Sequence, residues 1–224
     1  MKIFIGYDIR EDIAYQVCEY SIHKHQPDAE VIPLKQRELR ESGIYYRDID
    51  KLASTEFTFT RFLVPYLTDY KGWAVFTDCD FVFVDDVQKM FDNADDRYAV
   101  MVVKHDYTPK EGMKMDGCKQ LPYPRKNWSS SILWNCGHPS NRQVDLEMVN
   151  TQTGQYMHRF QWLKDEEIGE LKPEWNWLAG WYEESPEVGK PKAIHYTEGG
   201  PWFQEYRRCP YHKTWKKYLK EMLK

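Results

Sequence analysis

Apolar residues are arranged in two kinds of pattern along this chain. Short runs that are apolar throughout, which are typical of buried strands, alternate with longer stretches in which apolar residues recur every three or four positions, as on one face of a helix. The runs predict strands over 3–7, 29–34 and 73–84, and the spaced stretches predict helices over 13–23 and 57–66, the second stopping around Pro65. This alternation predicts an α/β fold with a mostly parallel central sheet flanked by helices.

The second half of the chain continues the alternation less regularly. Residues 105–126 are rich in Lys, Gly, Pro and Met without a clear period, and we expect a long loop that acts as a lid over a site. The C-terminal segment 206–224 is basic and aromatic, and we expect it to be a helix of the same single domain, 1–224. Further strands are predicted over 98–103 and 130–135, and helices over 85–91, 144–150 and 164–168.

Two carboxylates interrupt the apolar run 73–84. Asp78 and Asp80 are separated by one residue, so on an extended chain their side chains point to the same side while Cys79 faces the other way. Ligands of open α/β sheets bind just outside the carboxyl ends of such strands. The pair therefore predicts a metal site, and the alternative is a strand-ending turn whose Asp residues only cap the next helix.

Composition narrows the function classes. The formal net charge of -4 argues against a general nucleic-acid binder, whose domain is usually strongly basic. The five cysteines are odd in number and scattered, which favours reduced thiols and a cytoplasmic protein without a signal peptide. Aromatic residues make up 16% of the chain and include nine Trp, and sugar rings and nucleobases both stack on such side chains.

Three blocks resemble glycosyltransferases of the GT-A fold, most closely the family 8 type that uses nucleotide-diphosphate sugars. Arg61 on a helix before the Asp78–Asp80 strand is similar to that family's Arg helix and Asp-x-Asp strand. The opening strand with Gly6, Tyr7 and Asp8 matches the place where such enzymes bind the nucleobase and ribose. The resemblance spans nearly the whole chain.

The third block is His195-Tyr-Thr-Glu-Gly-Gly-Pro-Trp202, which is similar to the family's C-terminal His-Gly-Pro-Trp signature. The resemblance implies that His195 completes the metal site with Asp78 and Asp80, and that Gly199 and Gly200 allow the backbone to approach the diphosphate. Oxygen ligands with one imidazole suit Mn²⁺, with Mg²⁺ as a plausible substitute. Asp78 is thereby also a contact of the metal-bound nucleotide.

The resemblance implies a metal-dependent transferase that moves a hexose from a nucleotide-diphosphate sugar, expected to be a UDP-sugar, to a glycan or lipid-linked glycan with retention. Asp165 and Glu166 fall where related enzymes carry an acidic or amide residue beneath the donor sugar, and are the expected catalytic groups. Arg61 is expected to orient the first carboxylate or to reach the donor, with a structural ion pair as the alternative.

Two stretches depart from the family pattern. Gly200 stands where the family normally has a Lys that touches the diphosphate, so we expect another cation there, with Lys190, Lys192 and Arg207 as candidates near in sequence. Residues 127–136 replace the family's Asn-Ala-Gly stretch around the donor sugar, which leaves the sugar open.

The acceptor side is predicted from aromatic residues. Trp175, Trp177, Trp181 and Tyr182 are expected to form a stacking platform for an acceptor sugar, with Glu174 and Asn176 bonding to hydroxyls. The helix expected over 206–224 suits peripheral contact with the anionic inner face of a membrane, and the alternative is an ordinary helix packed through Trp215, Tyr218 and Met222.

Two rival functions stay open at this point. A haloacid-dehalogenase-type phosphatase also ends a strand in Asp-x-Asp, and Asp78 would then be the nucleophile. That fold normally carries the motif on its first strand, whereas a complete β-α-β-α precedes it here, and the His195 motif goes unexplained. The other rival is a sugar-binding module that keeps the metal without turnover.

Overall fold

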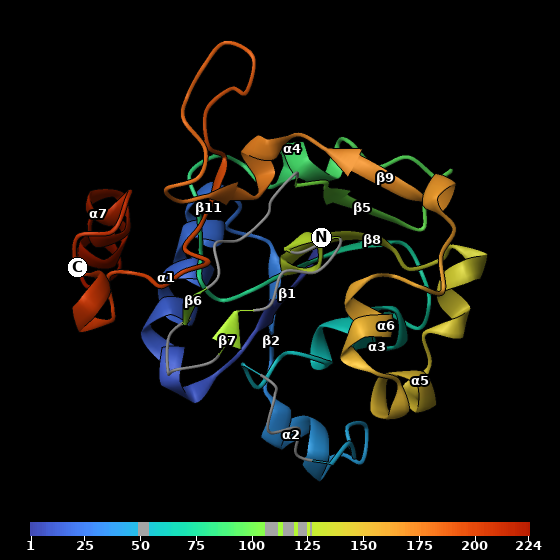
Figure 1. Ribbon diagram of the computed structural model, residues 1–224. Helices are drawn as coiled ribbons and strands as arrows, with labels where there is room; N and C mark the ends of the chain where they lie inside the picture. Colours follow the sequence, from blue (N-terminus) through green and yellow to red (C-terminus); the bar gives the residue numbers. More distant parts are fainter. Residues whose placement is uncertain (49–53, 106–111, 114–118, 121–124, 126) are drawn as a thin grey trace.

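A six-stranded sheet forms the centre of the computed structural model, which describes residues 1–48, 54–105, 112–113, 119–120, 125 and 127–224 (Figure 1). Its strand order is β2-β1-β3-β8-β5-β9, and only β8 runs antiparallel to its neighbours, so the predicted mostly parallel sheet is confirmed. The strands are β1 (Lys2–Gly6), β2 (Glu30–Leu34), β3 (Trp73–Thr77), β5 (Val100–Val103), β8 (Ser131–Asn135) and β9 (Ile168–Leu171).

A second, three-stranded sheet continues from the end of β3. It consists of β10 (Trp177–Leu178), β11 (Ala193–His195) and β4 (Phe81–Phe83), with β11 parallel to β10 and antiparallel to β4. The apolar run predicted as one strand is therefore two strands in two sheets, and Asp78 and Asp80 lie in the turn between them. Two further short strands, β6 (Gly112–Met113) and β7 (Lys119–Gln120), pair antiparallel.

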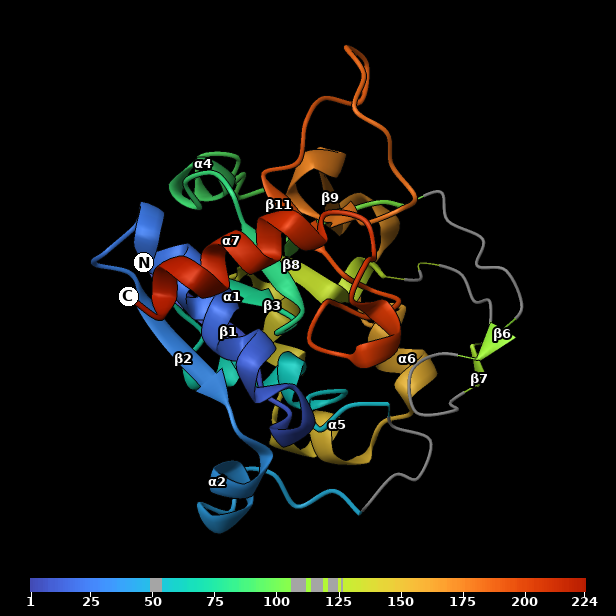
Figure 2. The same ribbon diagram turned by 90° about the vertical axis from the view of Figure 1, so that its left-hand side faces the viewer.

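Helices lie on both sides of the central sheet (Figure 1). On one side are α1 (Asp12–His25) and α7 (His212–Met222), and Figure 2 shows α7 crossing over α1. On the other side are α3 (Val64–Leu67), α5 (Leu146–Thr151) and α6 (Gly154–His158). The remaining α-helices are α2 (Gln36–Glu41) and α4 (Gln88–Phe91). No helix among the described residues is both long and apolar enough to cross a membrane.

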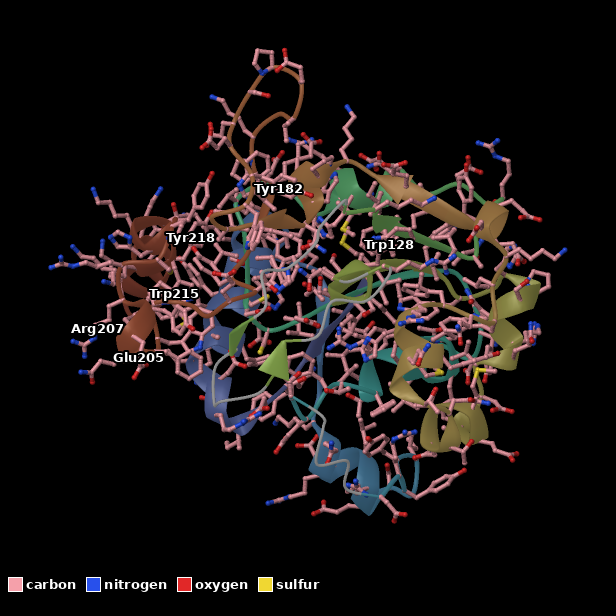
Figure 3. All side chains as sticks on the ribbon, viewed as in Figure 1. Trp128, Tyr182, Glu205, Arg207, Trp215 and Tyr218 are labelled. Carbon is pink, nitrogen blue, oxygen red and sulfur yellow. The ribbon has the colours of Figure 1, made fainter. Side chains whose placement is uncertain are left out.

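The C-terminal helix is anchored by its aromatic residues. Trp215 and Tyr218 are buried in a small apolar cluster with Tyr196, Ile194 and Val82, while most of the Lys residues of α7 stay exposed. Figure 3 shows Trp215 and Tyr218 at one edge of the molecule, with Arg207 and Glu205 projecting outward beside them. This is the packed-helix interpretation, with the helix confined to 212–222 of the predicted 206–224, and it leaves a basic outer face.

Two further predicted elements differ from the structure. The helix expected over 57–66 is instead the 3₁₀ helix η2 (Thr60–Leu63) followed by α3, which begins at Val64. Pro65 therefore does not stop the helix but lies in its first turn, where no backbone donor is needed. The helix expected over 164–168 is the three-residue 3₁₀ helix η6 (Asp165–Glu167), and Ile168 already belongs to β9. The predicted lid, 105–126, falls mostly outside the described residues.

Candidate metal and nucleotide site

Asp78 is held where β3 ends. Its backbone N–H donates to the carbonyl of Ser130 at 2.9 Å, and its Oδ1 lies 2.8 Å from Nη1 of Arg61. The buried Arg61 side chain also donates to the carbonyls of Ser129, at 2.8 Å, and Phe57, at 3.2 Å. Arg61 therefore ties η2, β3 and the chain before β8 together around the first carboxylate, and we describe it as a positioning residue.

Asp80 and His195 are brought together by strand pairing. The register of β4 and β11 sets His195 opposite Phe81, and the N–H of Tyr196 donates to the carbonyl of Asp80 at 2.9 Å. The imidazole of His195 stacks on the ring of Phe81 with centroids 4.4 Å apart, and its Nε2 lies 3.3 Å from Oδ2 of Asp80.

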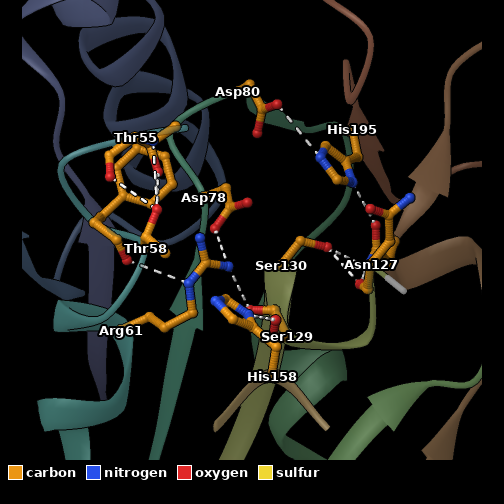
Figure 4. Close-up of polar contacts among 12 residues, drawn as sticks. Thr55, Thr58, Arg61, Asp78, Asp80, Asn127, Ser129, Ser130, His158 and His195 are labelled. Atoms are coloured by element: carbon orange, nitrogen blue, oxygen red, sulfur yellow. Dashed lines mark hydrogen bonds and ion pairs between the residues drawn. The ribbon is translucent and has the colours of Figure 1, made fainter. Parts of the chain in front are cut away.

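The three predicted metal ligands converge, because ligand atoms of Asp78, Asp80 and His195 all lie within 4.8 Å of one another (Figure 4). Cys79 faces the core and is fully buried, as predicted, although the chain forms a turn there and not an extended strand. The side chains of both aspartates are 14% exposed, so the group is open to an incoming ligand while largely shielded from water.

The ring of His195 is held from behind by Asn176. The amide nitrogen of Asn176 donates to Oγ of Ser130 at 2.9 Å and to the carbonyl of Asn127 at 3.2 Å, which directs its Oδ1 towards His195. That oxygen lies 2.9 Å from Nδ1 of His195, so Nδ1 carries the proton. Nε2 then faces the carboxylate of Asp80.

Nε2 of His195 and a carboxylate oxygen of Asp80 thus face each other at 3.3 Å. Two carboxylates and one imidazole form a ligand set that suits a divalent cation. Metal-bound histidines are usually supported by a hydrogen bond from the other ring nitrogen, and Nδ1–H provides that bond here. Asp78, Asp80 and His195 therefore fit a divalent cation, and the choice between Mn²⁺ and Mg²⁺ stays a prediction.

Glu11 is a buried acid beside this group that the sequence analysis missed. It ends the 3₁₀ helix η1 (Ile9–Glu11), is 5% exposed, and accepts a hydrogen bond from Nε1 of Trp202 at 3.2 Å. Burial, followed by the negative charges of Asp80 and Asp8, raises its pKa to about 8. In sequence it looked like an ordinary acidic residue at the start of a helix, so no signal set it apart.

His105 was also missed as a neighbour of the group. Its Nδ1 lies 2.7 Å from the hydroxyl of Tyr182, and the two rings stack with centroids 5.9 Å apart. Burial, with a smaller contribution from His195, lowers the pKa of His105 to about 3, so the imidazole is neutral at neutral pH. It was read only as the first residue of a long loop.

The expected nucleobase residues follow β1. Asp8 is buried and accepts from Nε and Nη2 of Arg10, at 3.0 and 2.7 Å, and from the N–H of Glu56 at 3.2 Å. Burial alone would raise the pKa of Asp8, but the hydrogen bonds from Arg10 and Glu56 lower it overall. The Tyr7 hydroxyl donates to Asp12 at 2.8 Å, and burial followed by this bond raises the pKa of Tyr7 to about 12.

The glycines at the predicted site are required by packed aromatic rings. A Cβ on Gly6 would lie 2.4 Å from the ring of Phe57, and one on Gly200 would lie 1.8 Å from the ring of Trp202. Gly199 has a φ of +133° and faces Tyr206. The structure thus accounts for Gly6, Gly199 and Gly200 without a ligand, and their predicted contact with a nucleotide stays a prediction.

Asp165 and Glu166 lie at a different edge of the sheet from the metal ligands. They precede β9, and the neighbouring Glu167 accepts hydrogen bonds from the N–H of Ala99 and from the hydroxyl of Ser140. Ser140 follows the end of β8 that pairs with the start of β3, whereas Asp78 follows the other end of β3. The side chain of Asp165 is 87% exposed and pairs with Arg125. The structure does not bring the predicted catalytic pair to the triad.

The predicted acceptor platform is divided between core and surface. Trp175 and Trp177 are almost completely buried, so they cannot stack on a sugar, whereas Trp181 and Tyr182 are partly exposed. Glu174 forms an ion pair with Lys192, so one of the cations suggested for the diphosphate already has a carboxylate partner. Asn176 is buried behind His195 and is not a sugar contact.

The overall architecture is that of solved glycosyltransferases. The glycosyltransferase GlyE of Streptococcus pneumoniae TIGR4 superposes with a TM-score of 0.65 at 14% identity over 99% of this chain, and the bifunctional glycosyltransferase WbbM with 0.66 at 16% over 100%. The chain spans 62% of GlyE and 51% of WbbM. The galactosyltransferase LgtC, solved with donor and acceptor sugar analogs, gives 0.58 at 11% identity, with 99% of this chain and 96% of LgtC covered.

The chain therefore has the GT-A fold, and it carries a carboxylate–carboxylate–histidine group at the end of β3. No protein-family model matches the sequence. Protein CDI of Arabidopsis thaliana is 52% identical over 223 residues, which make up 98% of this chain and 86% of that protein, so the chain belongs to the same family as Protein CDI. The GT-A fold argues against the phosphatase alternative for Asp78.

Proposed function

We propose that this protein is a metal-dependent glycosyltransferase that moves a hexose from a nucleotide-diphosphate sugar, expected to be a UDP-sugar, to a glycan or lipid-linked glycan with retention. One observation carries the proposal: within a GT-A fold, ligand atoms of Asp78, Asp80 and His195 lie within 4.8 Å of one another. Mn²⁺ or Mg²⁺ bound there would neutralise the charge that a diphosphate gains when its bond to the sugar breaks.

The residues around the triad have distinct supporting roles in this proposal. Arg61 fixes Asp78 and compensates its charge, and Asn176 keeps Nε2 of His195 directed at Asp80. Gly6, Tyr7 and Asp8 are the expected contacts of the nucleobase and ribose, since they lie at and just beyond the end of β1, which pairs directly with β3. Gly199 and Gly200 follow β11 and are the expected contacts of the diphosphate.

The retaining route that suits this geometry is same-face attack, in which the leaving phosphate accepts the proton of the acceptor hydroxyl. That route needs no carboxylate nucleophile, and Asp165 and Glu166 lie at another edge of the sheet. A double displacement would need a carboxylate beneath the donor sugar. The proposed transfer therefore does not use Asp165 or Glu166.

Two features support the expected setting of the enzyme. The described cysteines, Cys18, Cys79, Cys136 and Cys209, are free thiols, which suits the cytoplasm. The outer face of α7 presents Lys213, Lys216, Lys217 and Lys220, all exposed, and we propose that it contacts an anionic inner membrane surface peripherally.

The test is a titration of the protein with UDP and UDP-hexoses, with Mn²⁺ or with EDTA, followed by calorimetry. The expected result is nucleotide binding that requires the metal and is lost in Asp80→Asn, while the matched control Asp28→Asn, an exposed aspartate in a turn, binds like wild type. Equal nucleotide binding by Asp80→Asn would falsify the proposal. Binding without release of sugar in any acceptor or hydrolysis assay would favour a sugar-binding module.

A further inference from the structure

A basic hollow lies next to α6 and the segment that follows it. Its volume is about 530 Å³, and it is lined by Arg125, Tyr156, Arg159, Gln161 and Leu163. An indirect chain of contacts leads from it to the metal group: His158, which precedes Arg159, has its Nδ1 2.7 Å from Oγ of Ser129. The carbonyl of Ser129 in turn accepts the hydrogen bond of Arg61, the partner of Asp78 (Figure 4).

One cation of the hollow, Arg159, has a donor without an acceptor among the described residues. The Nε of Arg159 is buried and has no hydrogen-bond partner within the part of the chain that the structure describes. A buried guanidinium donor without an acceptor is costly, and a ligand oxygen is the natural way to satisfy it. Arg159 thus indicates a missing acceptor at this point.

The second cation of the hollow already holds a carboxylate. Arg125 pairs with Asp165, whose side chain is 87% exposed, and donates to the carbonyl of Arg159. Its guanidinium also lies 5.5 Å from the ring centre of Trp128, and Nζ of Lys104 lies 5.9 Å from the same ring. In a chain of net charge -4, this concentration of cations is selective for an anion.

The backbone is arranged to present these groups. Phe160 is fully buried and has a φ of +51°, an unfavourable conformation for an aromatic residue. This bend directs Phe160 into the core while Arg159 and Gln161 on either side line the hollow. Figure 3 shows Trp128 well away from the basic face of α7, so the two positive regions are separate surfaces.

We propose that the basic hollow binds an oxyanion, a carboxylate or a phosphate, that is carried by the sugar of the acceptor. The inference rests on the proposed function, which it deepens: the acceptor is an acidic sugar and not a neutral one. Arg159 and Arg125 receive the oxyanion, Gln161 donates to it or to a hydroxyl, and the rings of Tyr156 and Trp128 are available to stack on the sugar. In the absence of the ligand, the carboxylate of Asp165 pairs with Arg125, and the oxyanion of the ligand replaces it there.

The experiment is calorimetric titration of the full chain with glucuronate, glucose 6-phosphate and glucose in low-salt buffer. Both acidic sugars are expected to bind, and the tighter of them identifies the oxyanion. Arg159→Gln should weaken that binding about tenfold or more through the lost charge-assisted bonds, and Arg159→Lys by less. Asp165→Asn should strengthen it about threefold, because it removes the competing carboxylate.

Arg97→Gln is the matched control, because Arg97 is a 78% exposed arginine that pairs with Asp95 elsewhere on the surface, and it should bind like wild type. The proposal is wrong if neither acidic sugar binds with a dissociation constant below about 10 mM, or if glucose binds as tightly as they do. It is also wrong if Arg159→Gln binds them with wild-type affinity. The same samples are also titrated with UDP and Mn²⁺. Failure of the wild-type protein to bind UDP would overturn the proposed function alone, since the anion titration uses neither reagent.

Discussion

The chain contains two acidic clusters that look alike in sequence and differ completely in the fold. Asp78 and Asp80 lie between two sheets, are 14% exposed, and are bound by Arg61, His195 and backbone groups from distant segments. The side chain of Asp165 is 87% exposed, and Asp165, Glu166 and Glu167 together form the short 3₁₀ helix η6. Acids become a metal site where the fold removes water and supplies partners from several elements, and the density of carboxylates along the chain does not reveal this.

The largest effect should come from the arginine beside the first cluster, compared with the arginine beside the second. Arg61→Met leaves Asp78 and two carbonyls without their donor in a buried setting, and should lower the free energy of unfolding by about 3–5 kcal/mol. Arg125→Met removes an ion pair with an exposed partner and should cost less than about 1 kcal/mol. Urea unfolding of both variants in EDTA measures the contrast, and equal losses would contradict it.

Removing the support of His195 should come next. Asn176→Ala leaves the tautomer of His195 undetermined and should weaken Mn²⁺-dependent nucleotide binding about 10–100-fold. Asn176→Asp keeps an acceptor for the Nδ1 proton and should recover most of the affinity. Calorimetric titration with UDP and Mn²⁺ decides the point, and failure of the aspartate to do better than the alanine would count against a role in orienting the ring.

Glu11 tests how strongly the first cluster is desolvated. Its pKa is about 8 in the folded chain against an ordinary value of 4.5, so the folded state keeps a proton that the unfolded state releases between these pH values. Stability of the metal-free protein should therefore fall as pH rises from about 4.5 to about 8 through this group. Glu11→Gln keeps an acceptor for Trp202 and removes the ionisation.

The variant should accordingly be about 1–2 kcal/mol more stable than wild type at pH 8.5 in EDTA, with a smaller difference at pH 5. Urea denaturation at the two pH values measures this, and Glu41→Gln, in an exposed i,i+4 pair with Arg37, is the control that should show little change. A difference between Glu11→Gln and wild type that does not depend on pH would show that Glu11 is ionised in the folded protein throughout.

The smallest effect is expected at the second cluster. Asp165→Asn combined with Glu166→Gln should leave metal-dependent UDP binding unchanged within about twofold and change stability by less than about 0.5 kcal/mol, as is usual for exposed substitutions. Hexose transfer, once an acceptor is known, should retain the wild-type turnover number at saturating donor and acceptor. A loss of several orders of magnitude in turnover with unchanged binding would restore the carboxylates to the reacting centre.

Elements with a strong apolar pattern were predicted from sequence alone. The segments that became β1, α1, β2, β3 and β8 were all found, because their burial follows from a continuous run or a clear helical period. β9 was missed because Asp165, Glu166 and Glu167 favour a helix locally, whereas Ile168 and Leu171 are buried only through pairing with β5. That pairing is a tertiary contact that no local pattern records.

The same reasoning separates the parts of the site. Asp78, Asp80 and His195 were predicted because their motifs are specific and lie next to apolar strands. Asn176 was assigned to a sugar because its aromatic neighbours suggested an exposed loop, yet Trp175 and Trp177 are core residues. Glu11 carried no pattern, since its character comes from burial against residues far along the chain.

The pairing of β4 with β11 has a consequence for which insertions and deletions the chain tolerates. Successive side chains of a strand alternate between its two faces, so a one-residue slip of β11 along β4 would turn His195 away from Asp80. The loop that precedes β11 extends away from the body of the protein, drawn in orange in Figure 1. Added residues between Glu183 and Lys190 should therefore be harmless, while deletion of a single residue from 193–195 should erase the metal site in an otherwise folded protein.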